Sequence, residues 1–172
     1  ARRFFAFVFL SHASLILVGL ELHTPVSATG ALALWMSVSL SLTGFGLTLR
    51  ALEARFGSVN LARYQGLYDH APGLAVCFLL TGLGSVGLPG TLGFVAAEMV
   101  VDGAVESNIF VGLALIAAAT LNGIAVVRAY TRLFMGTPHV SSIPLGMSVR
   151  ERVAVLIVAA IILGAGLWPQ PG

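Results

Sequence analysis

The sequence predicts an all-α membrane protein: a polytopic transmembrane bundle of about six helices, one of which is short or broken. Of its 172 residues, 58% are hydrophobic and only 9% are charged, whereas an ordinary soluble domain has about 25% charged residues. Long apolar stretches recur along the chain, separated by polar or proline-containing residues. This composition argues against a soluble enzyme, a disordered tail and a nucleic-acid-binding domain.

Five stretches meet or approach the length of a transmembrane helix, which needs about 20 apolar residues. A sixth stretch, residues 91–101, is too short to cross a membrane alone and contains Glu98. Single strands would leave backbone groups unpaired in lipid, so all six stretches are predicted to be helical. We expect five long helices and a shorter one in a single bundle over residues 1–172. The five long stretches are residues 4–20, 28–49, 73–88, 109–127 and 153–168.

Proline and glycine mark the ends of the predicted helices. Pro72 suits the first turn of a helix. The pair Pro89-Gly90 is predicted to break the chain, because proline lacks an N–H group and clashes with the preceding turn. Thr91 is then a suitable N-cap for the short helix. Further ends are expected in a loop over residues 136–149 and at Pro169 and Pro171.

The basic residues are all arginines, nine of them against seven acidic residues, which gives a net charge of +2. If the short stretch re-enters the membrane without crossing it, all nine arginines lie on one side. If it crosses, they divide five to four. Membrane proteins concentrate basic residues on one side, which favours the re-entrant arrangement. Arg2 and Arg128 are expected at the membrane interface.

Glu98 is the first candidate for moving ions. A carboxylate inside the membrane costs roughly 2.5–3.5 kcal/mol, so such residues are retained for function. Asp102 and Glu106 follow at four-residue spacing and share its helix face. We expect Glu98 to face the bundle interior and residues 103–108 to unwind, because these carboxylates need water or partners. Alternatively, Asp102 and Glu106 mark a solvated helix end and Glu98 pairs locally.

His12 is the second candidate, because histidine titrates near physiological pH and suits proton transfer. The alternative is a neutral imidazole bonded to a backbone carbonyl. No pattern of histidine and cysteine spacing indicates a metal site. Residues 82–87 match G-x-G-x-x-G, but no strand precedes them, so close helix packing is the favoured interpretation.

Several motifs occur in an order that resembles the antiporter-type subunits of proton-pumping NADH:quinone oxidoreductase (complex I). The similarity is greatest to subunit-4-like members and extends to Mrp-type cation/proton antiporter and membrane-bound hydrogenase subunits. It covers nearly the whole chain, and the shared order is its most specific feature. The motifs include Arg2-Arg3, Ser11-His12, GLPGTLGF at 87–94, RAYTRLFMG at 128–136 and GLWPQP at 166–171.

The resemblance implies that the chain is the C-terminal part of a larger subunit in a bacterial cytoplasmic membrane. Such a subunit passes protons through buried charged residues, coupled to electron transport elsewhere, and carries no cofactor itself. Its partners would be other membrane subunits, the lipid bilayer, and protons or Na⁺. The residues expected to form the relay are Glu98, His12, Arg2 and Asp102.

The chain departs from the family pattern at three relay positions. Arg2 stands where the family usually has lysine, and arginine does not release a proton as lysine does. Val38 stands where a histidine is common. Ala97 aligns with the central lysine or glutamate of the broken helix, one residue before Glu98. Two alternatives therefore stay open: a stand-alone or Mrp/hydrogenase-type ion transporter, and a structural subunit that has lost its relay.

Overall fold

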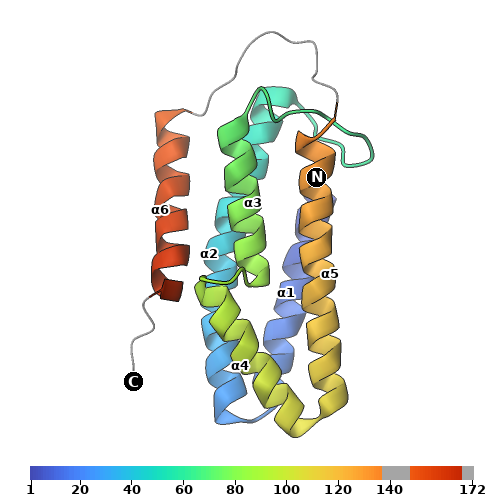
Figure 1. Ribbon diagram of the computed structural model, residues 1–172, viewed down its shortest axis with the longest axis vertical. Helices are drawn as coiled ribbons and strands as arrows, with labels where there is room; N and C mark the ends of the chain where they lie inside the picture. Colours follow the sequence, from blue (N-terminus) through green and yellow to red (C-terminus); the bar gives the residue numbers. More distant parts are fainter. Residues whose placement is uncertain (137–147, 168–172) are drawn as a thin grey trace.

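Six α-helices make up the part of the chain that the computed structural model describes, residues 1–136 and 148–167, and no β-strand occurs in that part. This confirms the predicted all-α fold. Most of the expected loop over 136–149, and the terminal prolines, lie outside the described residues. The helices are α1 (Arg2–Glu21), α2 (Pro25–Phe56), α3 (Pro72–Val86), α4 (Leu92–Ser107), α5 (Ile109–Phe134) and α6 (Val149–Leu167) (Figure 1).

Prolines and capping side chains begin three of the helices, and α2 starts three residues before the expected stretch 28–49. Pro25 opens α2, and the hydroxyl oxygen of Thr24 accepts a hydrogen bond from the Ser27 N–H at 3.1 Å. Pro72 opens α3, as predicted. Asn108 separates α4 from α5, and its side-chain oxygen accepts from the Phe110 N–H at 2.9 Å.

The break at Pro89-Gly90 divides one crossing of the bundle between two helices. α3 has 15 residues and α4 has 16, so each is about 22–24 Å long, less than the roughly 30 Å of the hydrocarbon core. They lie end to end beside the 32-residue α2, which packs against both (Figure 1). Two expectations were therefore wrong: α3 is not a long helix, and α4 does not re-enter but continues to the opposite end.

All nine arginines nevertheless lie toward one end of the bundle, which we call the arginine end. Here α1, α3 and α6 begin and α2 and α5 finish (Figure 1). Because α3 and α4 together make a single crossing, α5 returns the chain to this end. Four of the seven acidic residues lie in the other half, namely Glu21, Glu98, Asp102 and Glu106. α1, α2 and α5 are each long and apolar enough to span a membrane.

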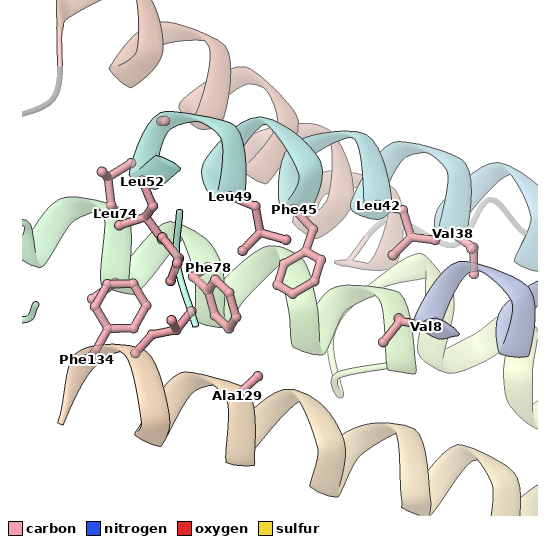
Figure 2. Packing of buried hydrophobic residues seen from close by; sticks show 14 of the residues in the cluster. Val8, Val38, Leu42, Phe45, Leu49, Leu52, Leu74, Phe78, Ala129 and Phe134 are labelled. Carbon is pink, nitrogen blue, oxygen red and sulfur yellow. The ribbon is translucent and has the colours of Figure 1, made fainter. Parts of the chain in front are cut away.

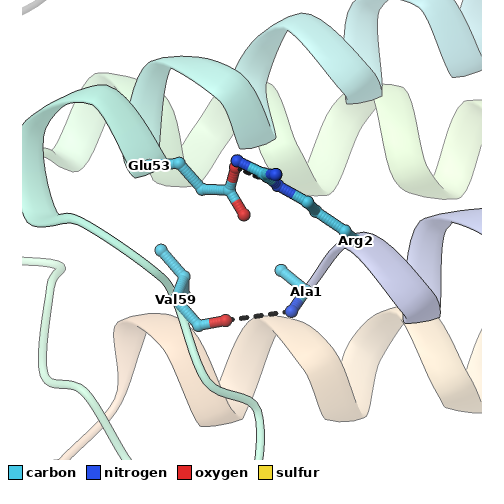
Figure 3. A network of polar contacts seen from close by, with 4 residues as sticks. All are labelled: Ala1, Arg2, Glu53 and Val59. Carbon is cyan, nitrogen blue, oxygen red and sulfur yellow. Dashed lines mark hydrogen bonds and ion pairs between the residues drawn. The ribbon is translucent and has the colours of Figure 1, made fainter.

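Contacts at the arginine end hold the start of α1 against the end of α2. The Arg2 Nε donates to Glu53 Oε2 at 2.9 Å, and the Ala1 amino group donates to the Val59 carbonyl at 2.9 Å (Figure 3). The Arg2 side chain is 86% exposed, so the ion pair stays in contact with solvent. Solvation limits the stability of such a pair to about 1 kcal/mol or less.

Large side chains fill the core near the arginine end, and glycines bring the helices close together beside them. Phe78 of α3 contacts Phe45 of α2 and Phe134 of α5 (Figure 2). A Cβ atom at Gly82 would lie 2.7 Å from Val126 Cγ1, which supports helix packing as the role of the G-x-G-x-x-G segment.

The predicted unwinding of residues 103–108 was wrong, because α4 stays helical through Ser107. A Cβ atom at Gly103 would lie 2.7 Å from both Ser27 Cβ and Thr24 Oγ1. This glycine therefore permits close approach between α4 and α2 and does not loosen the helix.

Candidate functional site

The junction between α3 and α4 leaves one backbone carbonyl in the bundle interior without a partner in its own helix. Gly87 caps the end of α3 with a left-handed φ of +99°, and Gly90 has a φ of +89°. Thr91 is the N-cap position of α4, but its hydroxyl donates to the Leu88 carbonyl at 2.7 Å and makes no cap bond. Pro89 has no N–H to donate four residues back, so the Ser85 carbonyl needs another donor.

The imidazole of His12 on α1 is placed to supply that donor. Its Nε2 lies 2.7 Å from the Ser85 oxygen and its Nδ1 lies 2.8 Å from the Val8 oxygen. The side chain is only 2% exposed. Both neighbours are acceptors, and a neutral imidazole carries one N–H whereas the imidazolium carries two. A neutral ring therefore donates a hydrogen bond to one carbonyl, and the protonated ring donates to both.

Two serines of α2 face the same junction. Ser37 and Ser41 are fully or almost fully buried, and their hydroxyl oxygens have no hydrogen-bond partner among the described residues. A Cβ atom built at Gly93 would lie 2.9 Å from Ser37 Oγ, and one at Gly84 would lie 3.4 Å from Ser41 Oγ. We name the set of His12, Ser37, Ser41 and Ser85 the break cluster.

The expected inward orientation of Glu98 was wrong. Glu98 and Asp102 are both exposed, together with Glu106, on the outer face of α4. The packed face of the helix carries Ala96 and Val100, which are buried against the bundle. The predicted shared face of the three carboxylates is present, but it points away from His12.

The four expected relay residues therefore do not form one cluster. His12 is buried at mid-bundle, Glu98 and Asp102 face outward, and Arg2 lies at the arginine end beside Glu53. Arg128 is also exposed near that end, so neither Arg2 nor Arg128 points into the bundle. Among the described residues, no group of three His, Cys, Asp or Glu side chains could hold a metal ion.

The serines of the break cluster were not predicted from the sequence. Ser85 could have been found, because it stands four residues before Pro89 and so must lose its helical partner. Ser37 and Ser41 are four residues apart and share one helix face, but only the packing of α2 against the α3–α4 junction shows that this face is buried.

The apolar helices and the break cluster define an integral membrane protein in which a broken helix packs against a long one. Residues 1–122 match the transmembrane family of NADH:quinone oxidoreductase and Mrp antiporter proteins. The match covers well over half of the chain, so the chain belongs to this family.

Relatives of known identity agree with this assignment. The chain is 27% identical over 170 residues to NADH-quinone oxidoreductase subunit M of Mycobacterium tuberculosis, covering 98% of this chain and 31% of that protein. It is 27% identical over 173 residues to subunit N of Thiobacillus denitrificans, covering 99% and 35%. The chain thus spans about a third of the length of these relatives.

Solved structures share the fold. Respiratory complex I from Thermus thermophilus with bound NADH contains a chain with a TM-score of 0.87 and 26% identity, covering 95% of this chain and 34% of that one. A chain of the Mrp complex from Dietzia has a TM-score of 0.85 at 19% identity, covering 95% and 39%. The second likeness concerns the fold alone.

Proposed function

We propose that this chain forms part of a proton-translocating membrane subunit of an NADH:quinone oxidoreductase-like complex in a bacterial cytoplasmic membrane. Family membership and the names of its relatives support this proposal. Electron transfer would take place in other subunits, and this chain would contribute only the ion path. The arginine end would face the cytoplasm, following the usual distribution of basic residues.

His12 is the observation that carries the proposal. A buried ring between two carbonyl acceptors gains a hydrogen bond when it binds a proton and loses one when it releases it. The protonated and neutral states differ by one hydrogen bond. The two acceptors keep their positions, since Val8 is on the same helix and Ser85 is fixed by the end of α3. This arrangement lets His12 hold a proton at mid-bundle without a paired carboxylate.

The serines would extend the path from His12 along the junction. A buried hydroxyl without a protein partner is commonly satisfied by an internal water molecule. Waters held by Ser37 and Ser41 would provide a hydrogen-bonded chain beside the α3–α4 junction. In this proposal Val38 contributes no relay group, and the hydroxyls on either side of it take over that role.

His12→Gln in the complete complex tests the proposal. Glutamine can still donate to one carbonyl, but it cannot carry the proton. A positioned acid–base group contributes on the order of 10²–10⁴-fold in proton transfer, so we expect NADH-driven proton uptake by membrane vesicles to fall about tenfold or more. The thermal midpoint of the assembled complex should change little. Parallel measurements of ²²Na⁺ uptake distinguish proton from sodium movement.

His23→Asn is the matched control, because His23 is exposed in the α1–α2 connection and has a positive φ of 55° that asparagine tolerates. It should leave uptake unchanged. If His12→Gln also leaves uptake unchanged and lowers the thermal midpoint, the relay proposal is wrong and the chain is a structural subunit.

We further propose that the exposed carboxylates of α4 contact a membrane helix of a neighbouring subunit. Glu98 lies about 9 Å along α4 from its first residue and so within the hydrocarbon region, where an uncovered charge is costly. A partner helix with a lysine or arginine at this depth would neutralise it. The solved relatives are subunits of multi-subunit membrane complexes, which fits such a neighbour.

Glu98→Gln combined with Asp102→Asn should therefore weaken assembly. We expect less of the chain in the intact complex on native gels, because a buried cation left without its partner costs about 3–5 kcal/mol. Glu106→Gln, near the end of α4, is the control and should assemble normally. Normal assembly of the double variant would contradict a charged contact at this face.

A further inference from the structure

A groove at the arginine end combines an apolar floor with two cationic side chains. It has a volume of about 390 Å³ and lies between α1, the α2–α3 connection and α5. Ala125 and Ala129 of α5 contribute small side chains, and Phe4 and Leu61 contribute apolar surface. Arg128 and Arg132 also line the groove, and their spacing of four places them on one helix face.

The side chains of the two arginines are not needed as hydrogen-bond donors to the last carbonyls of α5. The last backbone carbonyls of α5, and the carbonyl of the residue that follows it, already accept hydrogen bonds from backbone N–H groups of the α2–α3 connection. These bonds run from Gln65 to Arg132 at 2.9 Å, from Leu67 to Leu133 at 3.1 Å, from Tyr68 to Phe134 at 3.2 Å and from Gly66 to Met135 at 3.2 Å. The side-chain donors of both arginines are thus available for another acceptor.

Neither guanidinium is paired with a carboxylate in the described part of the chain. Arg132 lies over the Tyr64 ring, with its guanidinium carbon 4.5 Å from the ring centroid, which fixes its position and leaves its N–H edges free. A second groove beside α2 also contains Arg2 and Arg50, but Glu53 lies in it and reduces its positive charge.

We propose that the groove binds one anionic phospholipid, with its phosphate between Arg128 and Arg132 and an acyl chain along the alanine floor. Arginine forks match the two free oxygens of a phosphate diester. Basic pockets between transmembrane helices at the interface are typical sites for anionic headgroups. On α5 the lining extends from Arg132 to Ala125, so the groove offers charged and apolar contacts side by side, as a phosphate and an acyl chain require.

Lipid-dependent stability of the delipidated full-length protein in detergent tests this site. Dioleoylphosphatidylglycerol should raise the thermal midpoint of the wild type, whereas dioleoylphosphatidylcholine with the same chains should raise it much less. In the double variant Arg128→Gln/Arg132→Gln, the concentration of phosphatidylglycerol needed for half of the effect should rise at least about tenfold, because charge-assisted hydrogen bonds to the phosphate are lost. Arg152→Gln, exposed at the same end, should respond like the wild type.

A second variant keeps both charges and removes the space. Ala125→Leu fills the floor of the groove, and it should also weaken the response to phosphatidylglycerol. Three results would overturn the proposal. The first is an equal response to phosphatidylglycerol in the wild type and in the double variant. The second is an equal rise of the thermal midpoint with inorganic phosphate alone, which would indicate a phosphate site. The third is that the wild type shows no preference for phosphatidylglycerol over phosphatidylcholine.

Discussion

Phe78→Ala is expected to destabilise the bundle by about 2 kcal/mol or more. Phe78 is fully buried at the centre of the aromatic core, with ring centroids 4.6 Å from Phe45, 5.6 Å from Phe134 and 6.3 Å from Tyr130 (Figure 2). Such substitutions cost about 3–5 kcal/mol in soluble cores. In a bilayer, the part of this cost that comes from moving the ring out of the core is smaller, because lipid is itself apolar. The costs of the cavity and of the lost ring contacts remain.

The thermal midpoint of the full-length protein in detergent measures this effect. Phe7→Ala is the matched control, because Phe7 is the same residue type at 69% exposure on α1, and its substitution should change the free energy of unfolding by less than about 0.5 kcal/mol. Similar losses for both variants would show that the ring contacts of Phe78 contribute little to packing.

Local chemistry made the break and the start of α3 predictable. The absence of an N–H at Pro89 forces a junction whatever the surroundings are, and Pro72 opens a helix for the same local reason. The arrangement of α3 and α4 was harder to predict. Neither helix spans alone, and the sequence does not reveal whether a short helix turns back or stacks on the previous one, since that depends on its packing against α2.

The orientation of Glu98 could not be predicted from apolar periodicity, because the lipid and the core of a membrane bundle are both apolar. α4 exposes Phe94 and Val95 on its outer side, so hydrophobicity does not distinguish its two faces. The small residues are more informative: Gly93, Ala96 and Gly103 are buried and, together with Val100, recur at spacings of three and four. At about 100° per residue, Glu98 lies roughly opposite this seam. A search for the small-residue face would have placed the carboxylate outside.

The second prediction with a large expected effect concerns the contact of this α4 face with α2. Gly30→Ala on α2 is expected to destabilise the bundle by about 1–3 kcal/mol, the usual range for overpacking. A Cβ atom at Gly30 would lie 2.7 Å from Met99 Cβ, 3.0 Å from the Val100 nitrogen and 3.1 Å from the Ala96 oxygen. Two of these three atoms belong to the backbone of α4 and cannot rotate away. α2 and α4 must therefore separate, which loosens the contact that supports the α3–α4 junction.

Gly164→Ala provides a control of opposite sign. A Cβ atom at Gly164 on α6 would meet nothing within 4 Å, and alanine is a better helix former than glycine by about 1 kcal/mol. In the full-length protein, its thermal midpoint should stay level or rise, while that of Gly30→Ala falls. If the thermal midpoint of Gly30→Ala rises too, then α2 and α4 are not in close contact at this point, and the position of α4 along α2 must be revised. Because Ser37 lies two turns further along α2, a fall in midpoint should be accompanied by reduced proton uptake in the assembled complex.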